Sequence, residues 1–368
     1  MTAPRRPRRP FDDIDAAAAE LLARLGHGPA TPEGRSAEGA ARRDGATTAA
    51  GIEERLAAEM IRTAVKLLRD GADVGQLKLV SAAMKEMRHA YRIFGRYRER
   101  RKISIFGSAR TPPDHPDYAA AREFGRLIAQ AGWMAITGAG QGIMQAGHEG
   151  PQRDASFGLS IRLPFETTAN EVIEGDPKHI SFRYFFTRKL MFLSHSDAVA
   201  VFPGGFGTHD ELFEALTLVQ TGKSGIVPIV LIEGHHADGP RGYWPDWNSF
   251  VADHLLSNGW ISPEDLRLYH IAASVDDAVA HVLRFYRRFH SSRYVNDRLV
   301  LRLREPLAPA QVAALDAEFA PLVESGRFEQ GAALPEETDH LGLPRLHFHH
   351  TRRQYGLVRA LIDRVNSF

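Results

Sequence analysis

The sequence predicts an α/β protein: a Rossmann-like parallel sheet with helices on both faces, an N-terminal helical extension and a small C-terminal α+β unit. From residue 102 onward, short apolar runs alternate with helical patterns, which is typical of a parallel sheet wrapped by helices. Three of these apolar runs end in glycine-rich turns. The chain of 368 residues is long enough for one large α/β domain with appendages, or for two domains.

Composition and apolar periodicity divide the chain into four parts. The first part mixes Pro, Arg, Ala, Gly and Thr with few large apolar side chains, which predicts a flexible tail, with a short docking helix at 11–25. The second part has apolar residues at helical spacing. The predicted parts are a flexible tail at 1–50, a helical extension at 51–101, a Rossmann-like domain at 102–289 and a small β-α-β-α unit at 290–368.

The glycine-rich turns all follow candidate strands of the sheet. In open α/β sheets, ligands bind at the carboxyl ends of the strands, where such loops gather. Three glycine loops at one sheet edge therefore predict a nucleotide-sized ligand. The candidate strands are 103–106, 133–137, 155–161, 198–202 and 226–232, with possible edge strands at 180–186 and 268–272.

The most informative stretch is Pro203-Gly204-Gly205-Phe206-Gly207-Thr208-His209-Asp210-Glu211, directly after the apolar run 198–202. A strand, a glycine turn and a helix start bring backbone N–H groups, the positive end of a helix dipole and a Thr hydroxyl to one anion. A tight strand-to-helix turn is the alternative, but three glycines each cost backbone entropy. Glu211 follows one helical turn later, so we expect a phosphate site with a carboxylate beside it.

Two other segments belong with this motif. Gly138-Ala139-Gly140-Gln141-Gly142-Ile143-Met144 follows a strand and opens a helix, but its spacing is not Gly-x-Gly-x-x-Gly, so a mononucleotide turn fits better than a dinucleotide fingerprint. Arg188 and Lys189 stand at the start of a predicted helix, where cations are unfavourable with the dipole. Arg188 is either an exposed helix residue or a functional residue. Its helix leads into the strand at 198–202, which precedes the glycine motif, and this position favours a functional role.

Composition excludes several classes of protein and site. The chain has 46 basic and 45 acidic residues, which gives no nucleic-acid signature, and it has no cysteine for disulfides, Cys-based zinc sites or Cys nucleophiles. No apolar run approaches the roughly 20 residues that span a bilayer, and no apolar core follows the basic N-terminus. We therefore expect a cytoplasmic protein with neither nucleic-acid nor membrane partners.

Two further clusters each allow two interpretations. His347, His349 and His350 resemble a metal cluster, but on a strand His347 and His349 would face one side and His350 the other, which favours a solvated strand face. The basic run at 96–102 is either a solvated helix end, which we favour, or a patch for an anionic effector.

Taken together, the glycine loops and the Arg-Lys pair resemble the Lonely Guy family, over roughly 102–289. The family signature Pro-Gly-Gly-x-Gly-Thr-x-x-Glu is matched without a gap, and Phe106-Gly107-Ser108 adds to the match. One departure is Ala139, where the second loop often has a third consecutive glycine. The resemblance implies a phosphoribohydrolase that releases a free base from a nucleoside 5'-monophosphate, with Arg188 and Glu211 as its catalytic pair.

The implied reaction is hydrolysis of the N-glycosidic bond of AMP or an N6-modified AMP, such as a cytokinin riboside monophosphate, to the base and ribose 5-phosphate. A carboxylate such as Glu211 stabilises an oxocarbenium-like ribose and orients water. No metal and no cofactor are expected, and nothing supports the pyridoxal phosphate site that a lysine decarboxylase label would require. The residues expected to bind substrate or phosphate are Gly107, Ser108, Gly138, Gly140, Gly142, Met144, Lys189, Gly204, Gly205, Gly207 and Thr208.

Two alternatives remain open from the sequence. Larger relatives include nucleosidases of broad purine and pyrimidine specificity, and the length of this chain favours considering them. A non-catalytic nucleotide sensor or cofactor carrier would keep the pocket without turnover, although it would not need both Arg188 and Glu211. The resemblance also implies a homo-oligomer, a dimer or larger, with the helical extension and the C-terminal unit supplying interface or regulation.

Overall fold

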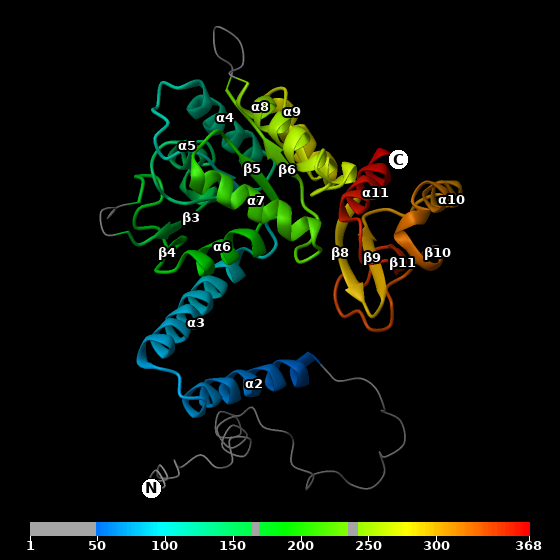
Figure 1. Cartoon of the computed structure of the whole chain (residues 1–368), viewed down its shortest axis with the longest axis horizontal. Coiled ribbons are helices and arrows are strands. Elements are labelled where there is room, and N and C mark those ends of the chain that lie inside the picture. The colour runs from blue at the N-terminus through cyan, green and yellow to red at the C-terminus, as the bar shows by residue number, and fades with distance from the viewer. Residues whose placement is uncertain (1–48, 164–168, 235–241) are drawn as a thin grey trace, which may run out of the picture. The chain divides into compact units, whose positions relative to one another are not determined.

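The computed structural model describes residues 49–163, 169–234 and 242–368 and divides into two compact units, one ending at Met84 and one starting at Lys85. The tail at 1–48 and its predicted docking helix lie outside the described residues. Helices α2 (Ala49–Arg69) and α3 (Val74–Phe94) form where the helical extension was predicted, and the unit boundary falls within α3. The rest of the chain forms the second unit, which contains two sheets (Figure 1).

The larger sheet has seven parallel strands in the order β4-β3-β2-β1-β5-β6-β7, which confirms the predicted Rossmann-like fold. The chain builds outward from β1 to β4 and then returns to place β5 on the other side of β1. The topological switch point therefore lies between β1 and β5. The strands are β1 (Lys102–Phe106), β2 (Met134–Thr137), β3 (Ser156–Ile161), β4 (His179–Phe182), β5 (Ala198–Val201), β6 (Ile229–Leu231) and β7 (Tyr269–Ile271).

Helices cover both faces of this sheet because its strands are apolar on both sides. In β1, Ile103 and Ile105 belong to one buried cluster and Phe106 to the other. The first cluster packs against α4 (Pro116–Gln130), α5 (Ile143–Glu149) and α9 (Val275–Phe285). The second packs against the end of α3 and against α6 (Phe185–Ser194), α7 (Phe206–Gln220) and α8 (Tyr243–Phe250), which continues as a π-helical turn at Val251–Leu256.

The smaller sheet is antiparallel, in the order β10-β11-β9-β8. The sequence predicted only the two central strands, β9 and β11. The edge strands β8 and β10 are polar and lack an alternation of apolar residues, as in Val323-Glu324-Ser325-Gly326-Arg327-Phe328 of β10. The β-α-β-α prediction is thus wrong, and the unit is β-β-α-β-β-α. Its elements are β8 (Phe289–Val295), β9 (Arg298–Leu303), α10 (Pro309–Glu318), β10 (Val323–Gly331), β11 (Arg345–His350) and α11 (Tyr355–Ser367).

The two sheets of the second unit share buried apolar contacts. Leu301 of β9, Phe348 of β11 and Leu361 of α11 lie in the same buried cluster as Val282 and Phe285 of α9. At Gly222, just after α7, an added Cβ would overlap the ring of Tyr355, so these two segments are in close contact. The C-terminal unit therefore packs directly against helices that flank the larger sheet.

Two of the three histidines of β11, His347 and His350, are buried, which corrects the expectation of a solvated strand face for these two, whereas His349 is half-buried. His347 is 6% exposed and His350 is 4% exposed. His347 Nδ1 lies 2.9 Å from Arg298 Nη1, whereas the other face of the strand brings His350 Nδ1 within 2.5 Å of the Tyr294 hydroxyl. Within the described ranges, no three His, Cys, Asp or Glu side chains are placed to hold a metal ion. Nor does any helix there have the length and apolar character to cross a membrane.

Candidate nucleotide site

The loops after β1, β2 and β5 meet at the carboxyl edge of the larger sheet. Ser108 joins all three: its N–H donates to Pro203 O at 3.1 Å, and its carbonyl accepts from Ile143 N at 3.0 Å. Close packing at Gly107 and Gly142 makes these contacts possible. A Cβ on Gly107 would come within 2.6 Å of Ile143, and Gly142 has a φ of +63° and lies against the backbone of Ser108.

The glycines of the motif after β5 fall into two kinds. Gly204 is required by packing, because an added Cβ would overlap Thr208 and come within 2.9 Å of Ser108 N. Gly205 and Gly207 are different, since a Cβ on either would meet no atom within 4 Å. Both precede or open α7, whose first N–H groups have no intrahelical partner. Neither glycine is needed by the fold, and this leaves the backbone open to a close approach by a ligand.

The second glycine loop is held by buried polar side chains. Ala139 has a φ of +64°, the left-handed region that favours glycine, which accounts for the glycine often found here in the family. The Ala139 N–H donates to Thr137 Oγ1 at 3.1 Å, and its carbonyl accepts from Asn170 N at 2.8 Å. Asn170 Nδ2 also donates to Gly140 O. Sequence reasoning missed Asn170, since it lies far along the chain in a segment without a motif.

Met144 packs over this loop. A Cβ on Gly138 would lie 2.6 Å from Met144 Sδ, and one on Gly140 would lie 2.7 Å from Met144 Cε. The same Gly138 position is 4.0 Å from Arg188 Nη1. The predicted residues Gly138, Gly140, Met144 and Arg188 are therefore neighbours in space.

Arg188 and Lys189 both lie on α6 but make different contacts, and Lys189 reaches α7. The Arg188 guanidinium carbon lies 5.1 Å from the ring centre of Phe185 and 5.7 Å from that of Phe192. Lys189 Nζ forms ion pairs with Asp210 at 2.8 Å and with Glu214 at 2.5 Å. Burial lowers the pKa of Lys189, but these two carboxylates raise it more, so the ammonium stays charged and ties α6 to α7.

Glu86 of α3 anchors the start of α6. Its carboxylate accepts hydrogen bonds from Arg183 N at 2.8 Å and from Thr187 Oγ1 at 2.7 Å, whereas the N-cap residue Tyr184 makes no side-chain cap. A carboxylate at a helix N-terminus is stabilised by the dipole and by the unpaired N–H groups. This contact fixes the start of the helix that carries Arg188. No local sequence pattern indicates this contact, because Glu86 stands 97 residues before Arg183.

Glu211 lies inside the structure at one turn into α7. It is 5% exposed, and among the described residues its Oε2 has no hydrogen-bond partner. Burial raises the pKa of Glu211 to about 7, although the charges of Lys189 and Arg188 oppose the rise. A carboxylate with a pKa near neutrality can act as base, acid or charge stabiliser for a reaction at physiological pH.

A tyrosine that the sequence analysis did not select holds the motif from the other side. The Tyr243 hydroxyl of α8 donates to Gly204 O at 2.5 Å and lies 2.8 Å from His209 Nε2. His209 and Tyr243 therefore fix the turn at Gly204. Burial lowers the pKa of His209, so the ring is neutral at physiological pH.

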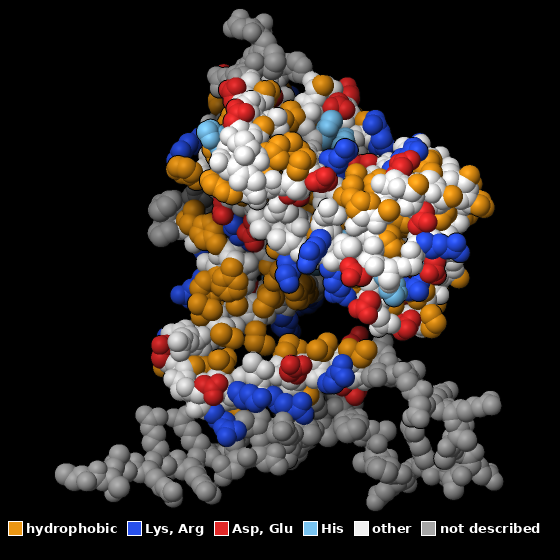
Figure 2. Space-filling view, turned by 45° about the vertical axis from the view of Figure 1, so that its right-hand side comes forward, with side chains coloured by type: hydrophobic (Ala, Val, Ile, Leu, Met, Phe, Trp, Pro, Cys, Tyr) orange, Lys and Arg blue, Asp and Glu red, His pale blue; other side chains and the backbone are white. Residues whose placement is uncertain are grey.

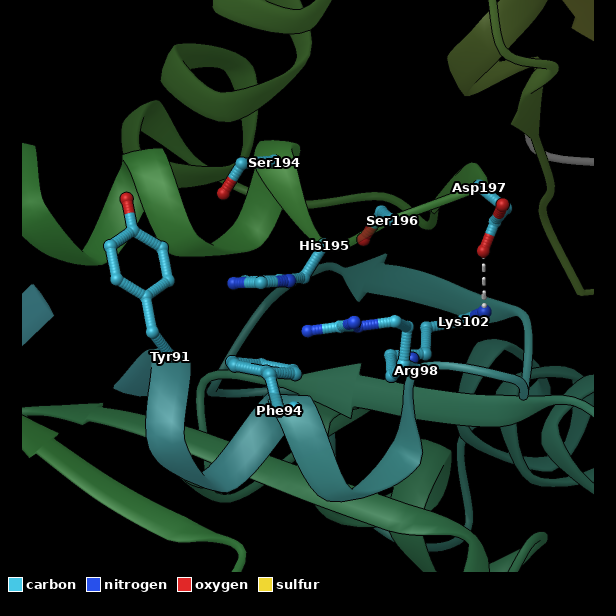
Figure 3. A pocket seen from close by; sticks show the side chains of 9 residues that line it. Tyr91, Phe94, Arg98, Lys102, Ser194, His195, Ser196 and Asp197 are labelled. Atoms are coloured by element: carbon cyan, nitrogen blue, oxygen red, sulfur yellow. Dashed lines mark hydrogen bonds between the residues drawn. The ribbon is translucent and has the colours of Figure 1, made fainter. Parts of the chain in front are cut away.

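The basic run at 96–102 lies at the opposite, amino edge of the sheet. Arg98 and Lys102 line a pocket of about 420 Å³ there, in which His195 stacks on Phe94 with ring centres 4.0 Å apart (Figure 3). Lys102 Nζ donates to two backbone carbonyls, and Arg101 pairs with Asp197 at 2.8 Å. Arg96 and Arg98 are exposed, as expected for a solvated helix end, whereas Lys102 at the end of the run is buried and Arg101 is half-buried. This pocket does not include the glycine loops.

The fold is that of a Rossmann-like protein whose glycine loops meet at the switch point of its sheet, and comparisons with known proteins agree with that class. The model of the family described as "Possible lysine decarboxylase" matches residues 135–282. The chain is 30% identical over 162 residues to the cytokinin riboside 5'-monophosphate phosphoribohydrolase of Mycobacterium tuberculosis, covering 43% of this chain and 81% of that relative. It is 29% identical over 168 residues to an enzyme of the same name from Arabidopsis thaliana, covering 44% and 73%.

The chain therefore belongs to the Lonely Guy family. Solved structures with a similar fold include the molybdenum cofactor carrier protein of Chlamydomonas reinhardtii. That protein is 23% identical, with a TM-score of 0.35, and the match covers 50% of this chain and 97% of that one. A molybdenum cofactor binding protein from Rippkaea orientalis is 20% identical with a TM-score of 0.34, covering 49% and 93%.

The burial of Glu211 predicts a pH-dependent stability. With a folded pKa near 7 and an ordinary value near 4.5, Glu211 costs little below pH 4.5, its cost builds up between pH 4.5 and pH 7, and it is nearly constant above pH 7. Glu211→Gln should therefore gain stability relative to the wild type as pH rises, by up to about 3 kcal/mol at pH 8. Denaturant unfolding at pH 5 and pH 8 measures this. Glu171→Gln, at an exposed site, is the matched control. An unchanged difference between the two pH values would contradict the burial argument.

Proposed function

We propose that the protein hydrolyses the N-glycosidic bond of a nucleoside 5'-monophosphate, with AMP or an N6-modified AMP as substrate, to the free base and ribose 5-phosphate. The observation that carries the proposal is the buried Glu211, which stands one helical turn beyond Gly205 and Gly207, the two glycines that the fold does not need. An anion at the start of α7 would set its attached ribose near this carboxylate. The names of the relatives from Mycobacterium tuberculosis and Arabidopsis thaliana support the same reaction class.

In this proposal each residue of the candidate site has a separate role. The open backbone at Gly205 and Gly207, with the positive end of α7, binds the 5'-phosphate and contributes binding energy that fixes the ribose. The ionised Glu211 stabilises the oxocarbenium-like ribose and orients the attacking water. Arg188, which approaches Gly138 from α6, holds the substrate or steadies the departing base. Lys189 forms ion pairs with Asp210 and Glu214, and these pairs hold α6 and α7 together beside Glu211.

The reaction is tested by incubating the purified protein with AMP, GMP, CMP and isopentenyl-AMP and separating the released bases by chromatography. We expect base release from at least one purine nucleotide, with a rate that rises through pH 7 as Glu211 ionises. The same panel distinguishes a cytokinin-type enzyme from one of broad purine and pyrimidine specificity. Release of no base from any of the four would end the enzyme proposal.

Glu211→Gln separates an enzyme from a nucleotide sensor or cofactor carrier. Loss of the carboxylate should lower the rate at least about 100-fold while nucleotide binding persists, as is typical when a transition-state partner is removed. A carrier would bind nucleotide equally well in both forms and release no base in either.

The phosphate role is tested at the glycine that the fold does not require. An added Cβ at Gly205 meets no atom within 4 Å, so Gly205→Val should fold normally yet raise the Michaelis constant for AMP by obstructing the phosphate. Thr208→Val should act in the same direction. Gly225→Ala, another glycine with open space around it, is the matched control and should leave the kinetics unchanged. Cleavage of adenosine as fast as AMP would show that this loop does not bind the phosphate.

We also propose that the protein is a homo-oligomer. The predicted apolar face of α2 is exposed, with Leu56 51% and Met60 55% accessible, and Phe206 beside the proposed site is 97% accessible. Hydrophobic side chains gather between charged ones on the surface (Figure 2), as at sites of protein association. Light scattering at micromolar concentration should show a dimer or larger, and Leu56→Glu with Met60→Glu should reduce its size more than Glu59→Gln does. A clean wild-type monomer would contradict the proposal.

A further inference from the structure

Two fully buried polar side chains lie beneath the second glycine loop, and the roles proposed above leave them unused. His148 belongs to α5, Asn170 follows β3 along the chain, and both are 0% exposed. Asn170 Nδ2 lies 3.1 Å and its Oδ1 lies 3.2 Å from His148 Nδ1, so these two distances fit either orientation of the amide. The groups around the pair decide between the two orientations.

The histidine ring has a single proton to place. Burial lowers the pKa of His148 more than its hydrogen bonds raise it, to about 4, and His179 of β4 adds to the fall, so the ring is neutral at physiological pH. A carbonyl oxygen only accepts, and Phe157 O lies 2.9 Å from His148 Nε2. We therefore assign the proton to Nε2, which leaves Nδ1 as an acceptor.

An accepting Nδ1 requires Asn170 to present its amide NH₂ group to the histidine. The same NH₂ group donates to Gly140 O at 2.9 Å, so its two hydrogens have two acceptors. The backbone N–H of Asn170 donates to Ala139 O at 2.8 Å. Asn170 thus binds the carbonyls of two successive residues of the glycine loop, and His148 fixes the amide orientation that makes this possible.

These two contacts determine where the N–H groups of the loop point. In a trans peptide, the N–H of one residue points opposite to the C=O of the residue before it. Because the carbonyls of Ala139 and Gly140 point to the buried Asn170, the N–H groups of Gly140 and Gln141 point away from it. Gly140 is half-buried and Gln141 is exposed, and neither N–H has a hydrogen-bond acceptor among the described residues. Two adjacent donors that face the same way can bind the oxygen atoms of a ligand.

We infer that Asn170 is a positioning residue of the nucleotide site and that His148 holds its amide in the donating orientation. Asn170 binds two carbonyls of the glycine loop and so turns the N–H groups of Gly140 and Gln141 toward the substrate. Arg188 of the proposed site lies beside the same loop. The inference rests on the proposed function, since it concerns the same site, but it is tested through nucleotide binding and not through base release.

Calorimetric titration with AMP tests the positioning role. The titrations use the Glu211→Gln protein, in which base release does not consume the ligand. Adding Asn170→Asp replaces the NH₂ donor with an oxygen of similar size that cannot donate to Gly140 O, so AMP binding should weaken at least about tenfold. Ile128→Ala is the matched control, a buried change at the end of α4 that leads into β2, and it should lower stability without weakening AMP binding.

Two variants of His148 separate the orientation of the amide from packing. His148→Asn places an amide oxygen near the position of Nδ1, so that an acceptor for Asn170 remains. His148→Leu fills a similar space without an acceptor. His148→Asn should therefore bind AMP more tightly than His148→Leu, by roughly fivefold, the effect of one neutral hydrogen bond. Equal binding by the two variants would overturn the role given to His148.

Nitrogen NMR of labelled histidine rings reports the orientation directly. The His148 signals, identified by their absence from the spectrum of His148→Asn, should show a proton on Nε2 and none on Nδ1 between pH 5 and pH 8. In Asn170→Asp the ring should gain a second proton in this range, because a carboxylate beside Nδ1 favours the charged ring.

A proton on Nδ1 in the wild type would overturn the inference, as would AMP binding that Asn170→Asp leaves unchanged. Absence of AMP binding by the Glu211→Gln protein would overturn it together with the proposed function. A wild-type protein that binds AMP and releases no base would end the enzyme proposal alone, because AMP binding and the histidine signals decide the role of Asn170.

Discussion

The structure depends on the point where the chain, having built β1 to β4 in one direction, returns to lay β5 against the other side of β1. This return brings the loop after β5 beside the loop after β1, and the Ser108 backbone joins both of them to the start of α5. The hydrogen bonds are between backbone groups, so they hold for any side chains that permit the approach. Gly107, Gly142 and Gly204 permit it because a Cβ at any of the three would overlap a neighbour.

A second constraint follows from burying Glu211 beside that junction. A lone ionised carboxylate is costly in a low-dielectric site, and the nearby Lys189 and Arg188 lower this cost without abolishing it. Because Lys189 is also bound to Asp210 and Glu214, its charge is shared among three carboxylates and does not fully neutralise any one of them. The result is an acidic group that changes its charge near neutral pH. Such tension between burial and partial compensation is more common at functional sites than in a purely structural core.

The sequence was sufficient for the parts of the fold where pattern and position coincide. All seven strands of the larger sheet are found at or near the predicted segments, because each apolar run is bounded by a glycine turn or a helix start. The edge strands β8 and β10 were missed because one-sided exposure removed the apolar signal on which the prediction relied. The glycines of the candidate site could be selected from the sequence, but Gly204 and Gly205 could be told apart only from the space around them. Glu86, Asn170 and Tyr243 carried no local signal, since each acts on a loop or helix far away in the chain.

These long-range contacts change how the appended segments should be understood. The relatives align with less than half of this chain, yet α3 anchors the start of α6 through Glu86, and the C-terminal unit contributes Leu361 and Phe348 to the core beneath α9. Helix α7 connects the two regions, because it begins within the glycine motif after β5, carries Glu211 and ends at Gln220, just before Gly222 packs against Tyr355 of α11. A displacement of α11 would therefore have to move the end of α7 or break that contact, since packed interiors do not deform continuously. The geometry of the candidate site therefore depends in part on elements that lie outside the region matched by the family model.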